Sequence, residues 1–378
     1  MRNIVSRGPA LDDAVIAFSL AHRDAPVLTA WIAGEMADPG DRRARALALR
    51  AAIAECRRAQ AGAPHAERKA FEAAVATLEA NLPVDADVHA VAGMVMFATP
   101  GGHTLVRSVT GAPVPSVTWQ VGPRLAPWFA TAPLPPAIVV VADRQHATLH
   151  RLDGAALSLL EHVDTSPSVE PVRHMGSAPQ LGFHVGTRGG TQRDSADRRR
   201  RESRVRHAAG IAQRITVHAG QDMDVVIGGV RETADLIADD LPAAFAGRIG
   251  RFVLGRSEAG GPAIVAASQR ALRELDAMRQ DAFISHLLDG PDVTGHTARG
   301  AVAVVHALAQ GAVDHVVVSP GFARTHAVQA DQIVLQALAE HAVVEIAHAA
   351  PAATLDAQSD GIVARLRFPV NQPEVAVR

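Results

Sequence analysis

The residues best suited to chemistry lie together between positions 188 and 206. Two adjacent glycines, Gly189 and Gly190, precede Thr191 and Gln192, and glycine lets a loop adopt positive φ angles and approach a ligand closely. An arginine-rich stretch follows, so that residues 188–206 hold eight arginines against three acidic residues. Guanidinium groups bind phosphates through paired hydrogen bonds, and a helix that starts beside the loop adds unpaired N–H groups. These residues therefore predict a phosphate-binding surface, for which the backbone of RNA is the favoured ligand.

The candidate residues of this surface fall into two groups. Gln192 is the candidate for orienting water in catalysis, together with the loop glycines Gly189 and Gly190. The candidates for contact with RNA phosphates are the arginines Arg188, Arg193, Arg198, Arg199, Arg200, Arg201, Arg204 and Arg206. An arginine run alone is also typical of a solvated surface helix beside a flexible loop, and that alternative stays open at this point.

A central segment, residues 137–262, must position this loop and helix. Its expected elements, in chain order, are strands over 138–143, 146–152 and 157–162, a polar glycine-rich stretch over about 165–192, a charged helix over 194–217, a strand over 223–228, a helix over 231–241 and a strand over 249–254. Short continuous apolar runs are typical of buried strands. A hairpin followed by helix, strand, helix and strand predicts an α/β sandwich.

The two flanking segments also predict α/β domains. Residues 1–135 are expected to contain a strand over 27–32, helices over 41–60 and 65–82, and strands over 88–99 and 103–110. Residues 263–378 are expected to contain helices over 266–289, 297–310 and 330–341, and strands over 315–319, 343–348 and 361–370. Three prolines within 133–136 favour a linker between the first two domains. The prediction is three α/β domains, of which the third is a small α/β/α sandwich.

The loop and helix resemble the middle domain of the archaeal and eukaryotic class I peptide-release factors. In that family an Arg-Gly-Gly-Gln motif precedes an arginine-rich helix. Arg188, Gly189, Gly190 and Gln192 stand in the places of the motif, with Thr191 inserted before the glutamine. The resemblance implies a middle domain related to the ribonuclease H fold, with a loop that reaches the peptidyl-transferase centre of the ribosome.

The resemblance continues in the third segment. Residues 298–318 contain a helix, Gly-Ala-Val and an apolar strand, and residues 361–368 are similar to the closing strand of the family's third domain. That domain is related to kink-turn-binding ribosomal proteins. Over 137–370 the chain is thus similar to the bacterial branch of the release-factor and Pelota family, which includes Balon-like ribosome hibernation factors. The first 135 residues differ, and they hold no Asn-Ile-Lys-Ser-like segment for reading a codon.

The inserted Thr191 bears on the chemistry that the resemblance implies. In the family the glutamine helps water attack the peptidyl-tRNA ester, and one extra residue moves Gln192 by up to about 3.5 Å. Because a misplacement of about 1 Å can cost about 100-fold in rate, we favour a protein that does not catalyse hydrolysis. The alternative is an enzyme, a peptide-release or rescue factor that hydrolyses peptidyl-tRNA or cleaves tRNA through this loop. A third class is an interaction module with the same fold and no link to ribosomes.

The favoured function is that of a ribosome-binding factor in the A site of idle or stalled ribosomes, a role in hibernation under stress. The implied partners are ribosomal RNA, the base of the large-subunit stalk and a translational GTPase. No cofactor motif is present, and the single cysteine, Cys56, excludes an internal disulfide or a thiolate cage for a metal. The net charge of -2 excludes a uniformly basic coat but allows a local basic patch. No apolar run approaches the ~20 residues of a membrane span, so we expect a soluble, cytoplasmic protein.

Weaker constellations favour structural roles. His341, Glu345 and His348 are close in sequence but fall across a predicted helix end and strand, so no metal site is expected there. Asp222 and Asp224 precede a strand and leave open a pair of nuclease carboxylates. We expect three further residues to be ordinary charges at the start of a helix, without a functional role: Arg231, Glu232 and Asp235. The tryptophans are expected to be core or interface anchors and not platforms for stacking bases: Trp31, Trp119 and Trp128.

Overall fold

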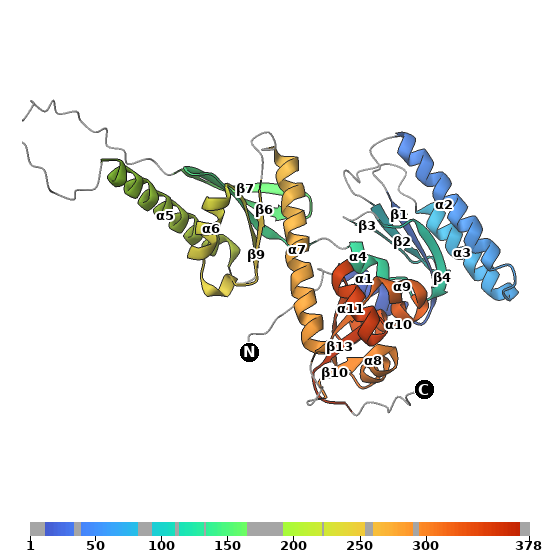
Figure 1. Cartoon of the computed structure of the whole chain (residues 1–378). Coiled ribbons are helices and arrows are strands. Elements are labelled where there is room, and N and C mark those ends of the chain that lie inside the picture. The colour runs from blue at the N-terminus through green and yellow to red at the C-terminus, as the bar shows by residue number, and fades with distance from the viewer. Residues whose placement is uncertain are drawn as a thin grey trace, which may run out of the picture. The chain divides into compact units, whose positions relative to one another are not determined.

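The chain divides into two compact units in the computed structural model. The first unit joins Met1–Leu134 to Asp276–Arg378, and the central unit is Pro135–Leu275. The residues whose structure is described are 12–33, 39–81, 93–109, 113–131, 134–164, 192–220, 223–253, 260–289 and 295–370. Within them the chain forms α-helices and three β-sheets, so the multi-domain α/β architecture is confirmed (Figure 1). None of the described helices combines the length and apolar character that a bilayer span requires.

The central unit is built on a five-stranded sheet with the order β7-β6-β5-β8-β9. Its strands are β5 (Ala137–Ala142), β6 (His146–Asp153), β7 (Ala156–Asp164), β8 (Asp224–Gly229) and β9 (Ile249–Phe252). The first three are antiparallel neighbours, whereas β5, β8 and β9 are parallel. The helices α5 (Gln192–Ala219) and α6 (Arg231–Asp240) lie side by side against this sheet, and the short helix η1 (Ala243–Phe245) precedes β9 (Figure 1).

One apolar cluster binds α5 and α6 to the central sheet. Ile211 and Ile215 on α5 and Ile237 on α6 are fully buried against residues of β5, β6 and β8. The predicted order of strand, hairpin, long helix, strand, helix and strand is confirmed in this unit. Its domain boundaries at 137 and 262 remain a prediction, because the helix α7 (Gly261–Leu288) crosses from the central unit into the first unit at residue 276.

A glycine joins β8 to α6 where only glycine fits. Gly229 has a φ of +110°, and a Cβ atom on it would lie 2.1 Å from the carbonyl oxygen of Ala142. The next residue, Val230, donates its backbone N–H to that same oxygen at 3.0 Å. This close approach brings the start of α6 to the end of β5, where the two parallel strands β5 and β8 both end.

The N-terminal sheet of the first unit has the order β3-β2-β1-β4 and is antiparallel. Its strands are β1 (Pro26–Ala33), β2 (Gly93–Ala98), β3 (Thr104–Val109) and β4 (Ser116–Val121). Its helices are α1 (Asp13–Ala21), α2 (Pro39–Ala59), α3 (His65–Ala80) and α4 (Ala126–Thr131). Alternate residues of β1 face different cores: Leu28 and Ala30 pack with α2 and α3, whereas Val27 and Trp31 pack with α1 and α4.

The C-terminal sheet of the first unit has the order β10-β13-β11-β12. Its strands are β10 (Thr297–Arg299), β11 (Val313–Val318), β12 (Val343–Ile346) and β13 (Ile362–Leu366). Its helices are α8 (Gly300–Ala309), α9 (Pro320–Thr325), α10 (Ala327–Ala339) and α11 (Ala349–Ser359), and the second half of α7 packs on it too. The prediction of one helix over 297–310 is wrong at its start, because residues 297–299 pair with β13 and the helix begins at Gly300.

The two sheets of the first unit share one hydrophobic core. Trp31 and Phe97 of the N-terminal sheet belong to the same buried cluster as Val304 of α8 and Leu338 of α10. A buried carboxylate crosses this boundary: Asp331 of α10 is 1% exposed and accepts hydrogen bonds from the backbone N–H groups of Leu125 and Ala126, both at 2.9 Å, and from Gln120 at 3.0 Å. The first and third predicted domains therefore pack as one body.

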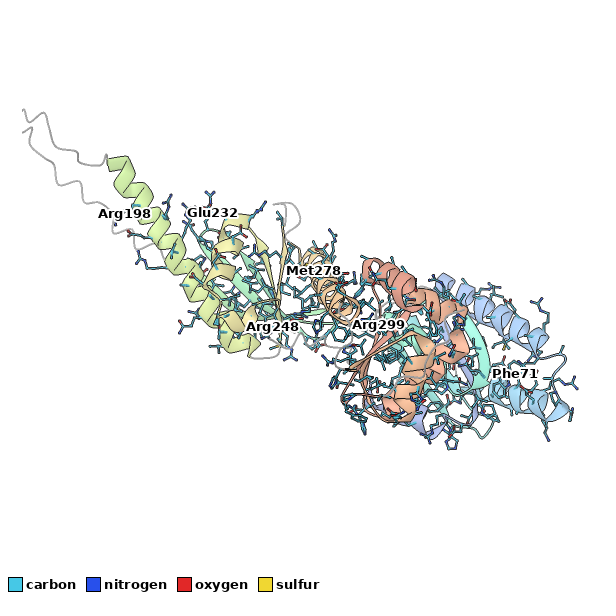
Figure 2. The ribbon with its side chains drawn as sticks, turned by 60° about the horizontal axis from the view of Figure 1, so that its bottom comes forward. Phe71, Arg198, Glu232, Arg248, Met278 and Arg299 are labelled. Atoms are coloured by element: carbon cyan, nitrogen blue, oxygen red, sulfur yellow. The ribbon has the colours of Figure 1, made fainter. Side chains whose placement is uncertain are left out.

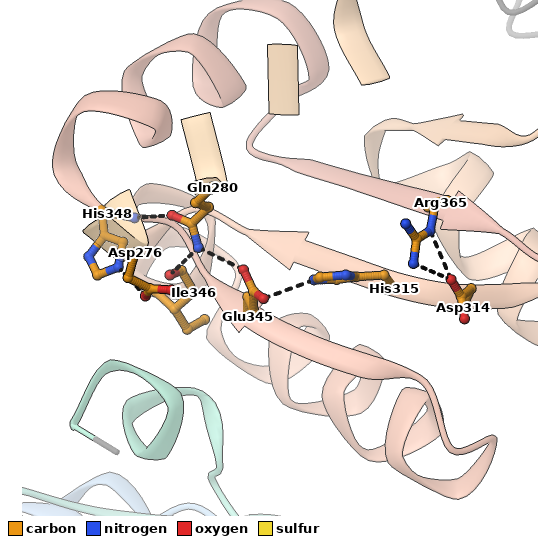
Figure 3. A network of polar contacts seen from close by, with 8 residues as sticks. All are labelled: Asp276, Gln280, Asp314, His315, Glu345, Ile346, His348 and Arg365. Atoms are coloured by element: carbon orange, nitrogen blue, oxygen red, sulfur yellow. Dashed lines mark hydrogen bonds and ion pairs between the residues drawn. The ribbon is translucent and has the colours of Figure 1, made fainter. Parts of the chain in front are cut away.

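A second polar network fixes α7 to the C-terminal sheet (Figure 3). Gln280 of α7 donates to Glu345 at 3.0 Å, and its side-chain oxygen accepts from the backbone N–H of His348 at 2.6 Å. Glu345 also lies 3.2 Å from the buried imidazole of His315, and His348 lies 2.9 Å from Asp276. Both the amide nitrogen and the oxygen of Gln280 are therefore hydrogen-bonded, as a polar side chain buried in a core requires.

Candidate nucleic-acid interface

The helix α5 has two halves of opposite character. In its second half, Ala208, Ile211, Ala212 and Ile215 recur at spacings of three and four residues and face the core of the central unit. That spacing places them on one side of a helix and explains why this half lies flat on the sheet. In the first half, residues 192–206, none of the side chains that the structure describes belongs to that core, and this half holds the arginine run. The sequence therefore folds a helix that is anchored at one end and charged at the other.

The described arginines of the first half differ in exposure. Arg198 has 82% of its side chain exposed, and Arg201 and Arg206 are also exposed. Arg204 is half-buried, with 29% of its side chain exposed. Figure 2 labels Arg198 on α5 and Glu232 on α6. Three guanidinium groups thus reach solvent from two turns of one helix, which is the arrangement that phosphate binding requires.

Acidic partners balance part of this charge. Arg198 Nε lies 3.1 Å from Glu202 Oε1, one turn further along α5, and Arg206 Nε donates to the backbone carbonyl of Glu202 at 3.4 Å. Arg204 reaches across to α6, where its Nη1 lies 2.5 Å from Glu232 Oε1. Exposed ion pairs of this kind contribute only about 0–1 kcal/mol, so a phosphate can compete with them for the guanidinium groups.

Charges beyond α5 extend the surface onto α6 and β9. Asp235 lies between two guanidinium groups, 3.8 Å from Arg231 and 2.5 Å from Arg251. The sequence pattern predicted Glu232 and Asp235 only as charges of a helix start, and it contained no signal for their partners on α5 and β9. Both acids do lie in or near the first turn of α6, but their contacts join separate elements.

Several predicted site residues lie outside the described residues. Arg188, Gly189 and Gly190 belong to residues 165–191, of which no structure is given. Gln192 is the first residue of α5, two residues before the predicted start of the helix. The remaining predicted arginines lie within α5, although their side chains are outside the described set: Arg193, Arg199 and Arg200. The roles of all these residues remain predictions.

Two alternative sites from the sequence receive no support from the described residues. Asp224 is largely buried, and its Oδ1 lies 3.9 Å from Arg248 Nε, while Asp222 lies outside the described residues. Glu345 pairs with His315 instead of gathering with His341 and His348. In the part of the chain that is described, no three His, Cys, Asp or Glu side chains are placed to hold a metal ion.

His207 adds little positive charge to α5 at neutral pH. Burial lowers the pKa of His207 on α5, although the nearby carboxylate of Asp143 works in the opposite direction. At the far end of the helix, His218 lies 3.2 Å from Glu161, a carboxylate that also binds Arg214. The positive charge of the candidate interface therefore comes from its arginines.

The tryptophans contribute to packing, as the sequence predicted. Trp31 and Trp128 are at most 4% exposed, and their ring centroids lie 6.4 Å apart in the core of the first unit. Trp119 packs edge-on against Phe71 of α3, with centroids 5.7 Å apart. None of these rings is presented to solvent as a flat platform, so base stacking on tryptophan is not part of the interface.

Comparison with known proteins yields structural similarities only. No protein-family profile matches the sequence, and no curated protein matches it. Archaeoglobus fulgidus Pelota is 13% identical, with 74% of this chain aligned to 80% of that chain and a TM-score of 0.39. Archaeal Pelota in a model bound to the ribosome, with ABCE1, is also 13% identical, over 97% of this chain and 96% of that chain, with a TM-score of 0.39. The archaeal translation termination factor aRF1 is 16% identical, over 95% of this chain and 99% of that chain, with a TM-score of 0.25. Such identities and TM-scores by themselves establish neither the fold nor the function.

Proposed function

We propose that this chain is a ribosome-binding translation factor that occupies the A site of idle or stalled ribosomes and shields it without catalysing a reaction. The observation that carries the proposal is the row of exposed arginines, Arg198, Arg201 and Arg206, on the free half of α5. This half directly follows the loop with Gly189 and Gly190, so a phosphate-binding helix and a loop able to approach RNA closely are joined in sequence.

The three parts of the chain would take different roles on the ribosome. The loop before α5 would point toward the peptidyl-transferase centre, and the arginines of α5 would neutralise phosphates of ribosomal RNA beside it. The third segment, which resembles the third domain of the release-factor family, a relative of kink-turn-binding ribosomal proteins, would contact the stalk base of the large subunit or a translational GTPase. The role of a hibernation factor follows from this occupancy, because a filled A site excludes tRNA.

A non-catalytic role agrees with two features of the loop. Thr191 separates the glycine pair from Gln192, unlike the release-factor pattern, and Gln192 already forms the first residue of α5. The backbone of a residue within a helix is fixed, whereas the glutamine of the release-factor motif lies in a loop before the helix. The alternative of a peptide-release or tRNA-cleaving rescue factor is favoured by the glycine pair and glutamine themselves, which retain the composition of that motif.

The test is co-sedimentation of the purified chain with vacant ribosomes of its source organism over a series of salt concentrations. Electrostatic binding to RNA predicts that log K falls linearly with log salt, by roughly 0.7–0.9 per phosphate contact. Replacing Arg198, Arg201 and Arg206 together with glutamine should weaken binding and flatten this slope by about 2–3. Absent or salt-insensitive association of the unaltered protein would contradict the proposal.

A matched control removes the same charge elsewhere on the central unit. The exposed arginines Arg151 of β6 and Arg270 and Arg273 of α7 serve for this purpose. Their replacement with glutamine should change the slope by much less. Release of labelled peptide from loaded ribosomes then distinguishes the alternative: turnover that disappears in Gln192→Ala would show that the protein is an enzyme.

A further inference from the structure

Arg204 differs from the other described arginines in the first half of α5. Its side chain is 29% exposed, and its Nη1 lies 2.5 Å from Oε1 of Glu232, a residue 28 positions away on α6. Arg198, by comparison, is 82% exposed and pairs with Glu202 on its own helix. Arg204 is therefore held by a partner from a separate element, at the point where α5 lies beside α6.

Glu232 occupies the place that a phosphate would take on Arg204. Carboxylate and phosphate oxygens accept the same hydrogen bonds from a guanidinium group, so the two compete for it. Glu232 keeps 54% of its side chain exposed, which leaves the pair open to an incoming ligand and makes the bond weak. While the pair persists, it is electrically neutral and takes Arg204 out of the positive field of α5.

We propose that Glu232 is an internal counter-ion of the RNA-binding surface, which masks Arg204 in the free protein and is displaced by an RNA phosphate on binding. The inference rests on the proposed RNA-binding role of α5. An RNA phosphate that binds Arg204 must first break the Arg204–Glu232 pair. This requirement lowers the affinity for any phosphate chain, and it favours RNA sites whose phosphates contact both Arg204 and the exposed arginines Arg198 and Arg201. Glu232 thus sets a threshold against weak, non-specific RNA binding.

The experiment measures ribosome affinity and its salt dependence for Glu232→Gln, which keeps the shape of the side chain and removes its charge. We expect binding about two- to fivefold tighter at 0.1 M salt, and a salt slope steeper by about 0.7–0.9, one further phosphate contact. The control Asp239→Asn removes the same charge from an exposed residue of α6. It lies seven residues, about 10 Å, along the helix, near the limit of electrostatic reach at this salt concentration.

A double mutant tests whether Glu232 acts through Arg204. In an Arg204→Gln background, Glu232→Gln should have no further effect on affinity or slope. Equal effects of Glu232→Gln and Asp239→Asn, an unchanged affinity, or an effect that persists without Arg204 would each overturn the inference. The proposed function survives those results, because it fails on different ones, such as absent or salt-insensitive association of the unaltered protein with ribosomes. Circular dichroism melting verifies that all variants are folded.

Discussion

Replacing Asp331 with alanine tests how the N-terminal and C-terminal sheets of the first unit are joined. The carboxylate is 1% exposed and accepts from Leu125, Ala126 and Gln120, all of which belong to the N-terminal half of that unit. Alanine leaves these three donors without an acceptor. Gln120 is partly exposed and can turn to water, whereas the N–H groups of Leu125 and Ala126 are buried. Each buried donor without a partner costs about 1–3 kcal/mol, so the free energy of unfolding should fall by about 2–5 kcal/mol.

Asparagine at the same position is the matched control. Asp331→Asn keeps an oxygen that accepts from the two backbone N–H groups, and the Gln120 amide can reverse to accept from the new amide. The expected loss is therefore only about 1 kcal/mol. Urea unfolding followed by tryptophan fluorescence is the appropriate assay, because all three tryptophans lie in the first unit. A loss for Asp331→Ala no larger than that of Asp331→Asn would refute the role of the carboxylate.

The same residue predicts a pH dependence with a defined sign. Burial raises the pKa of Asp331 above the ordinary aspartate value of 3.8, and the hydrogen bonds from Ala126, Gln120 and Leu125 only partly oppose that rise. A raised pKa in the folded state means that this group's contribution to stability is complete below pH 3.8 and is lost as pH rises through the folded value. The unaltered protein should therefore lose stability relative to Asp331→Asn as pH is raised above 3.8 toward neutrality. Parallel pH profiles for the two proteins would show that the carboxyl is not buried as described.

Two further predictions concern the central unit. Gly229 has a φ of +110°, and an added Cβ would collide with Ala142, so Gly229→Ala should lower the free energy of unfolding by about 3 kcal/mol or more. The control is Gly247→Ala, at φ +74° with nothing within 4 Å of the added Cβ, which should lower it by about 1–2 kcal/mol in the same thermal unfolding assay. Equal losses would disprove the close approach at Gly229. The hydrogen bond that His146 donates to Asp164 raises the pKa of His146 above 6.5, so Asp164→Asn should lower the midpoint of the His146 imidazole in an NMR titration, and an unmoved midpoint would exclude that contact.

The elements of the central unit could be predicted from the sequence because their patterns are local. Strands predicted over 138–143 and 223–228 are seen as β5 and β8, one residue displaced, since a short continuous apolar run bounded by turn residues is typical of a buried strand. The helix predicted over 194–217 is α5, which extends two residues further at each end. Elements without such a pattern were missed: α11 is rich in alanine and has no apolar stripe, and β10 is too short to alternate.

Tertiary contacts of the site could not be predicted in this way. The exposure of the arginines of α5 could be predicted because so many of them lie close together in the sequence. The pairing of Arg204 with Glu232 could not, because it depends on how α6 lies beside α5. The joining of the first and third segments had one signal in the sequence, the run over 27–32, which is apolar except for Thr29 and is typical of a strand covered on both faces. The helices α2 and α3 cover only one of these faces, and the helices of the third segment, with α1 and α4, cover the other.

The most direct test of the central claim is a cryo-electron microscopy reconstruction of vacant ribosomes incubated with a saturating amount of the protein. The account predicts density for the chain in the A site, with the N-terminal end of α5 directed toward the peptidyl-transferase centre and Arg198 and Arg201 against phosphates of ribosomal RNA. An empty A site, or a bound protein whose α5 arginines face solvent, would contradict it.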